Sequence, residues 1–318
     1  MTMSNLWIEK HRPSTLKDIK GHTDIINTIS KYGGVKNIPH LLLYGPAGTG
    51  KTSTILALAK ESYGINFRTM VLEMNASDDR GLDIVRNTIQ MFVETTGITM
   101  GSDEHSVKLV ILDEADAMTL DAQSALRGIM EKYTSCVRFC ICCNFVNKII
   151  PSLRSRCTRF RFSGLSPGHL REKLEDVIVK ESVYISESAV GAIISMSGGD
   201  TRKVINILQS SHMMKGSGMI QMDDIYKCTG IPLPGHISNI LETLTTGTFA
   251  ESHHLISEII RENGYSISDI VTGVYQTIPD TSTGIISIME ELSDIEYRIS
   301  HGASNLINVG SLVSAFHV

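Results

Sequence analysis

The chain has little of what marks a membrane protein or a secreted protein. None of its apolar runs approaches the roughly 20 residues that a membrane-spanning helix needs, and the segment Met1–Leu6 is short and polar, unlike a leader peptide. The 318 residues are 42% hydrophobic and 20% charged, which is typical of a folded globular protein. We therefore expect a soluble intracellular protein that is long enough for two or three domains.

Cysteine is scarce as well. Four of the six cysteines crowd the region of one predicted strand, where alternate residues face opposite sides of a sheet. No second Cys/His pair follows at the spacing of a metal site, so reduced core cysteines are favoured over a zinc site, as in a cytosolic or nuclear protein. The cysteines are Cys136, Cys140, Cys142, Cys143, Cys157 and Cys228.

An excess of positive charge is also missing. The net charge of −5 argues against a protein that binds nucleic acid over its whole surface, because neutralising phosphates requires a concentrated basic surface. One local basic cluster is present, and such a run is more often a solvated face or a contact between subunits than a groove for DNA. The cluster consists of Lys148, Arg154, Arg156, Arg159 and Arg161.

A glycine-rich segment carries the strongest functional signal. It matches the pattern G-x-x-x-x-G-K-[ST], follows the apolar run Leu41–Tyr44 and precedes a predicted helix over Ser53–Lys60, a context that favours a nucleotide site over an ordinary glycine turn. The backbone N–H groups and the helix dipole of such a loop bind phosphates, while Lys51 and Thr52 would hold the β- and γ-phosphates and Mg²⁺. The loop residues are Gly45, Pro46, Ala47, Gly48, Thr49, Gly50, Lys51 and Thr52, followed by Ser53.

A second apolar segment, Lys108–Asp116, ends in carboxylates. It predicts a buried parallel strand, whose carboxyl end would lie beside the phosphate loop. Asp113 would orient Mg²⁺ there, and Glu114 would polarise a water molecule for attack on the γ-phosphate. A solvated strand end is the alternative, which the preceding apolar run disfavours. The letters Asp-Glu-Ala-Asp also occur in a class of helicases, but the further motifs of that class are not found.

The order of the predicted elements indicates the domain organisation. Strands alternate with helical stretches up to about Phe162, which predicts an α/β domain with a parallel sheet covered by helices on both faces. Only helical patterns follow, with predicted N-caps at Ser166, Ser186 and Asp200. We expect an ATP-binding α/β domain over residues 1–163, a helical lid over 164–230 and, beginning with the linker Ile231–Gly235, an all-helical domain over 231–318. The predicted strands are Leu41–Tyr44, Thr69–Met74, Leu109–Leu112, Arg138–Cys143 and Thr158–Phe162.

The order of the motifs resembles that of the replication factor C small subunits. The matching segments, besides the phosphate loop, are Trp7–Pro13, Asn75–Gly81, Asp113–Asp116 and Ser155–Cys157. The resemblance implies an AAA+ P-loop ATPase domain, a helical lid and a helical collar, in one of the five subunits of a nuclear heteropentamer. With ATP and Mg²⁺, that complex is expected to load a PCNA-type sliding clamp onto primer-template DNA during replication and repair.

The resemblance also implies roles for single residues. Ile8, Arg12 and the turn Ile19–Gly21 would line the adenine pocket. Asn144 resembles sensor 1, which positions the attacking water, and its alternative is a plain strand-end asparagine. Arg202 resembles sensor 2, a lid cation that reaches ATP, and its alternative is a helix-surface arginine.

Four basic residues would act outside this chain's own nucleotide site. Arg156 resembles the arginine finger, which would enter the neighbouring subunit's ATP site and act in trans, and a structural salt bridge is its alternative. Arg80, Arg86 and Lys148 would contact the DNA backbone, with solvated surface charges as the alternative. Contacts of that kind go to phosphate and carry no base sequence.

Two positions depart from the family's pattern. Ala47 stands where a second proline is usual, and it adds a backbone N–H donor to the phosphate loop. Gly128 follows Arg127 in place of a second arginine, which removes a charge and should weaken its helix by about 1 kcal/mol relative to alanine.

Two other functions stay open. The chain could be a nucleotide-binding structural subunit with little hydrolysis of its own, but Glu114 and Asn144 are both present and count against this. It could also be a DNA-remodelling motor of the same superfamily that forms homohexamers. The helical patterns after Ile231 disfavour that function, because they predict no β-rich or winged DNA-binding domain.

Overall fold

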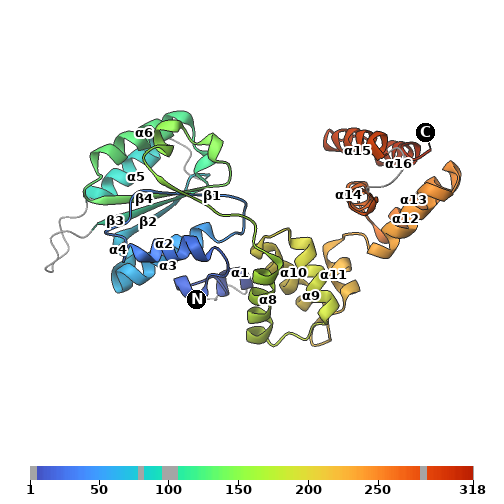
Figure 1. Cartoon of the computed structure of the whole chain (residues 1–318), viewed down its shortest axis with the longest axis horizontal. Helices are drawn as coiled ribbons and strands as arrows, with labels where there is room; N and C mark the ends of the chain where they lie inside the picture. The colour runs from blue at the N-terminus through green and yellow to red at the C-terminus, as the bar shows by residue number, and fades with distance from the viewer. Residues whose placement is uncertain (1–5, 78–81, 95–106, 280–284, 318) are drawn as a thin grey trace. The chain divides into compact units, whose positions relative to one another are not determined.

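The chain forms two compact units, Met1–Gln209 and Ser210–Val318 (Figure 1). The structure is a computed structural model that describes residues 6–77, 82–94, 107–279 and 285–317. The boundary between the units falls inside a helix that spans Thr201–Lys215. The domain limits expected at residues 164 and 231 therefore stay predictions.

The first unit is built on a five-stranded parallel sheet. Its strands are β1 (Leu41–Tyr44), β2 (Val71–Asn75), β3 (Lys108–Asp113), β4 (Val137–Cys143) and β5 (Thr158–Arg161). The spatial order is β2-β3-β4-β1-β5, and Leu41 of β1 lies opposite both Cys140 of β4 and Thr158 of β5. Because all strands run in one direction, their carboxyl ends meet at one edge of the sheet, where ligands bind in folds of this class.

Helices cover both faces of this sheet (Figure 1). Helices α2 (Thr23–Lys31) and α3 (Lys51–Tyr63) share one apolar core with Leu41 and Leu43 of β1. Helices α5 (Leu82–Glu94) and α6 (Leu120–Lys132) share a second core with Leu42, on the other face. Burial on both faces explains why the central strands are apolar at almost every position.

The predicted strand Thr69–Met74 is wrong at its beginning. Helix α4 (Phe67–Met70) occupies the first two of these residues, and β2 begins at Val71. A short apolar run does not distinguish a last helical turn from a strand by periodicity alone. The other four strands begin and end within one residue of the predicted bounds. Two further short helices of this unit are α1 (Trp7–Lys10) and α7 (Pro151–Arg154).

The cysteines of β4 lie in the two cores of the sheet. Cys140 and Cys142 belong to the core with α2 and α3, and Cys143 belongs to the core with α5 and α6. Burial raises the pKa of Cys143 and of Cys157 to about 12, so both thiols stay protonated at neutral pH. Within the described residues, no group of three or more His, Cys, Asp or Glu side chains could hold a metal ion.

Three helices follow the sheet, and each begins at its predicted cap. The hydroxyls of Ser166 and Ser186 accept backbone N–H bonds from the first turns that follow them. The carboxylate of Asp200 accepts a bond from the N–H of Arg202 at 2.8 Å. Such caps satisfy N–H groups that have no partner inside the helix. The three helices are α8 (Pro167–Glu181), α9 (Glu187–Ser197) and α10 (Thr201–Lys215), and their residues up to Gln209 belong to the first unit.

The second unit contains the remaining helices of the described chain, and those from α12 onward pack on an isoleucine-rich core that includes Ile240, Ile256, Ile270 and Ile295, all 0% exposed. The predicted linker is shorter than expected, because α12 begins at Pro234, which occupies the first helical turn. No helix among the described residues is long and apolar enough to cross a membrane. The helices are α11 (Met222–Thr229), α12 (Pro234–Thr246), α13 (Phe249–Asn263), α14 (Ile267–Thr277), α15 (Ile285–Ser300) and α16 (Asn305–Ser314).

Candidate functional site

The glycine-rich segment forms a tight loop between β1 and α3. Gly48 and Gly50 have φ angles of +67° and +94°, a region that favours glycine. A Cβ at Gly48 would lie 1.6 Å from Oδ1 of Asp200, and a Cβ at Gly45 would lie 1.8 Å from the carbonyl oxygen of Phe162. The hydroxyl of Thr201 also donates to the carbonyl of Gly48 at 2.5 Å. The start of α10 is therefore seated directly on the loop.

Lys51 is the buried cation of the site. Lys51 is the first residue of α3 and is 7% exposed. Its Nζ donates to the carbonyls of Gly45 at 2.7 Å and Pro46 at 2.8 Å and to Oδ1 of Asn144 at 3.0 Å. Burial lowers the pKa of Lys51, although the nearby carboxylate of Asp113 opposes the effect. Phosphate oxygens would compete well for this ammonium group, because charge-assisted hydrogen bonds are stronger than bonds to neutral oxygens.

An oxygen cluster lies where α3 meets the end of β3. The hydroxyl of Thr52 donates to Oδ2 of Asp113 at 2.7 Å, and the backbone N–H of Glu114 donates to Oδ1 at 2.9 Å. Hydroxyl and carboxylate oxygens are the ligands that Mg²⁺ accepts, so this pair fits that ion. Glu114 has a φ of +51°, an uncommon conformation for a residue with a side chain, and its exposed side chain lines the cavity.

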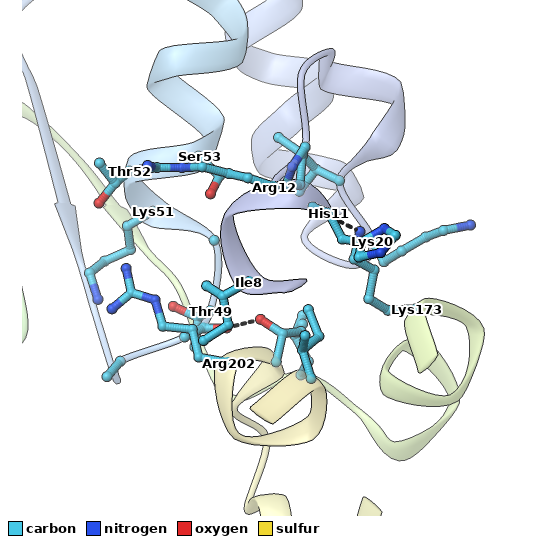
Figure 2. A pocket seen from close by; sticks show the side chains of 18 of the residues that line it. Ile8, His11, Arg12, Lys20, Thr49, Lys51, Thr52, Ser53, Lys173 and Arg202 are labelled. Atoms are coloured by element: carbon cyan, nitrogen blue, oxygen red, sulfur yellow. Dashed lines mark hydrogen bonds between the residues drawn. The ribbon is translucent and has the colours of Figure 1, made fainter. Parts of the chain in front are cut away.

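One cavity connects these groups, and Figure 2 shows part of its lining. Ile8 and Arg12, near the start of the described chain, line one part of the cavity, and Arg202 extends from α10 toward Lys51. The predicted site residues that line the cavity are Ile8, Arg12, Ala47, Gly48, Thr49, Gly50, Lys51, Thr52, Ser53, Asp113, Glu114, Asn144 and Arg202. The structure therefore brings together residues from five separate stretches of sequence, and their individual roles stay predictions.

Gly21 is not among the residues that line the cavity. With a φ of +78°, it packs against the lid: a Cβ there would lie 2.5 Å from Cδ2 of Leu165, and Leu165 does line the cavity. The lining also includes Ile19 and Lys20 of the same predicted turn, and it includes His11 and Lys173, which the sequence analysis did not select. His11 lies within the segment Trp7–Pro13 and Lys173 lies on α8, and both reach the cavity through the packing of α8 against the start of the chain.

Arg156 lies away from the cavity. It directly precedes Cys157 and the strand β5, whereas the phosphate loop follows the other end of the adjacent, parallel strand β1. Its guanidinium is half-exposed and contacts the carboxylate of Glu131 on α6. This position is at the opposite edge of the sheet from the phosphate loop of the same chain.

The three basic residues selected for DNA are only partly described. Lys148 is exposed, and its ammonium group lies 5.3 Å from the centre of the Phe145 ring. Arg86 lies on helix α5, whose side chains at that end are outside the described part of the chain, and Arg80 lies outside the described residues altogether. Their contact with DNA stays a prediction.

Comparison with known proteins adds to this geometry. Residues 41–165 match the ATPase family associated with various cellular activities (AAA), and residues 232–315 match the replication factor C C-terminal domain. Replication factor C subunit 5 of Arabidopsis thaliana is 47% identical over 98% of this chain and 86% of its own length. Subunit 5 of Homo sapiens is 46% identical over 98% and 91%, and subunit 3 of Saccharomyces cerevisiae is 40% identical over 97% and 92%.

Solved structures show the same fold at a greater distance in sequence. The Thermotoga maritima RuvB Holliday junction branch migration motor is 17% identical, has a TM-score of 0.56 and covers 84% of this chain and 89% of its own. At that identity the likeness concerns the fold alone.

Proposed function

The chain belongs to the replication factor C family and is an AAA+ ATPase subunit of a clamp loader; on that premise we propose how its own residues act. It binds ATP with Mg²⁺ in the cavity between the phosphate loop and the lid. It works in the nucleus as one of five related but different subunits, which together open a PCNA-type clamp and place it on primer-template DNA.

The observation that carries the proposal is the bond between Thr52 and Asp113, beside the bond between Lys51 and Asn144. The hydroxyl of Thr52 and the carboxylate of Asp113 are 2.7 Å apart and would hold Mg²⁺. When bound, that ion neutralises charge on the β- and γ-phosphates. Lys51 binds the same phosphates, and the amide of Asn144, 3.0 Å from the Lys51 Nζ, is left to orient a water molecule near the γ-phosphate.

Glu114 is the group that would polarise the attacking water. Its N–H bond to Asp113 and its left-handed backbone fix where the side chain leaves the end of β3. The carboxylate is exposed on the cavity wall, so it is available to a water molecule rather than used in the core. This supports hydrolysis by the site over the alternative of a structural subunit that only binds nucleotide.

Arg156 would complete a neighbour's site instead of its own. A guanidinium at the amino end of β5 is a full strand length away from a phosphate loop at the carboxyl end of β1. It is half-exposed, so a partner's nucleotide can take the place of Glu131. Hydrolysis in the assembly would then depend on pairs of adjacent chains. Arg80, Arg86 and Lys148 are proposed to contact phosphates of the DNA backbone.

Native mass and clamp loading test this function. The chain is co-expressed with the other replication factor C subunits, and we expect one copy in a five-membered assembly that loads a labelled clamp onto primed DNA. Glu114→Gln should assemble normally and load slowly, with Arg159→Ala, an exposed arginine outside the site, as the matched control. A homohexamer would contradict the proposal and favour a DNA-remodelling motor, and unchanged hydrolysis in Glu114→Gln would favour the structural subunit.

A further inference from the structure

The start of the described chain is tied to the lid by four contacts. We call residues 7–13 the strap. At one end, the backbone N–H of Trp7 donates to Oε1 of Gln209 on α10 at 3.0 Å. At the other end, Lys173 on α8 donates to the carbonyl of His11 at 2.9 Å. Lys10 and His11 both contact Glu181, the last residue of α8. The strap is therefore bound to two lid helices.

Glu181 is the centre of these contacts. Its Oε1 lies 2.5 Å from Nε2 of His11 and 2.7 Å from Nζ of Lys10. The side chains of Glu181 and His11 are only 12% and 5% exposed. Burial by itself would raise the pKa of Glu181, but the bonds from Lys10 and His11 outweigh it and hold the pKa below its ordinary value. A carboxylate in such surroundings stays charged, and removing it leaves the buried imidazole of His11 without this partner.

The strap also forms a wall of the cavity. Ile8 and Arg12 line the cavity, and so do His11 and Lys173, through which the strap is held (Figure 2). Arg12 directly follows His11, so fixing the imidazole of His11 fixes the backbone from which the Arg12 side chain leaves. The contacts of α8 therefore lead to Ile8 and Arg12 through the strap and do not involve the phosphate loop.

We propose that Glu181 is a positioning residue for nucleotide binding, which holds the strap to the lid so that Ile8 and Arg12 close on the nucleotide together with Arg202. Glu181 acts through His11 and does not touch the ligand. This inference rests on the proposed function, because it takes the cavity to be the nucleotide site. It predicts that a change at the far end of α8 alters nucleotide affinity, while the hydrolytic groups at β3 and β4 are left in place.

The sequence supplies a built-in reporter of the strap. Trp7 is the only tryptophan among the 318 residues. It is 8% exposed, and its ring meets the His11 ring edge to face, with centroids 6.5 Å apart. Its fluorescence is therefore specific to the strap and sensitive to the position of His11.

The test titrates the full chain with ATP and Mg²⁺ while Trp7 emission is recorded. Wild type should show a saturable emission change, and Glu181→Gln should raise the Kd about tenfold, the size of effect that follows from losing charge-assisted bonds. Glu187→Gln is the matched control, because Glu187 is a lid carboxylate that is 73% exposed and contacts Arg171 instead of the strap. In the assembled complex, Glu181→Gln should raise KM for ATP and leave kcat unchanged.

A second pair of variants covers the case that Glu181→Gln does not fold. Gln209→Leu removes the acceptor of the Trp7 N–H and should weaken ATP binding in the same direction, whereas Gln209→Glu keeps an acceptor oxygen and should bind more nearly as wild type does. Folded Glu181→Gln or Gln209→Leu with wild-type Kd and emission change would overturn the inference alone. Absence of ATP binding by wild type would overturn the nucleotide site and the inference with it.

Discussion

His40 should make the stability of this chain depend on pH. It is 9% exposed and lies just before β1, and its Nδ1 accepts a bond from the backbone N–H of Phe139 at 3.2 Å. Burial, helped by the charges of Arg138 and Arg156, lowers the pKa of His40 from 6.5 to about 4. Protonation would remove the acceptor and place a third positive charge beside two arginines.

The sign and size of the effect follow from this difference. The unfolded chain binds the His40 proton near pH 6.5 and the folded chain only near pH 4, so the stabilisation is fully present above about pH 6.5 and is lost as the pH falls toward 4. One unit of pKa difference corresponds to about 1.4 kcal/mol. The full difference is therefore roughly 3.4 kcal/mol, of which about 2.5 kcal/mol should be lost by pH 4.5.

Urea denaturation of the isolated chain at a series of pH values measures this loss. Other groups also titrate in this range, so the comparison is with His40→Asn, whose amide oxygen can accept the Phe139 N–H but does not titrate. The free energy of unfolding of wild type, relative to the variant, should fall by about 2.5 kcal/mol between pH 7.5 and pH 4.5. Parallel pH profiles for the two proteins would refute the reasoning.

Three further predictions concern single positions. Gly128→Ala should raise the free energy of unfolding by about 1 kcal/mol in chemical denaturation, because Gly128 is exposed within α6 and a Cβ there meets nothing within 4 Å; a loss of stability would contradict the open space. Thr52→Val should bind ATP equally well with and without Mg²⁺ in calorimetry, whereas wild type should bind more tightly with it; an intact Mg²⁺ effect would show that the hydroxyl is not a ligand. Gly48→Ala should lower the melting temperature and weaken nucleotide binding, because its Cβ would collide with Asp200, and a wild-type Kd in a nucleotide titration would show that the lid adapts.

Much of the sheet could be predicted from sequence because the signals are local. The run Leu41–Tyr44 followed by a glycine-rich loop, and the run Leu109–Leu112 followed by two carboxylates, each specify a buried strand and what comes after it. Parallel strands then bring Lys51, Asp113 and Asn144 to the same edge without further information. That is why residues from distant parts of the sequence line one cavity.

The remainder depends on tertiary packing, which no local pattern encodes. The close approach of Gly21 to Leu165 joins residues far apart in sequence, and the role of Gly21 in the adenine pocket stays a prediction. His11 and Lys173 line the cavity because α8 packs on the strap, and this packing joins residues 162 positions apart in sequence. The contact of Arg156 with Glu131 likewise joins two residues that are 25 positions apart in sequence.

The most direct test of the account is the ATPase activity of the assembled complex with clamp and primed DNA, compared with the activity of this chain alone. We predict that assembly stimulates hydrolysis, that Glu114→Gln removes the contribution of this chain's site, and that Arg156→Ala reduces hydrolysis at the neighbour's site while ATP binding to this chain is unchanged. Robust hydrolysis by the isolated chain, indifferent to clamp, to DNA and to Arg156→Ala, would contradict the account.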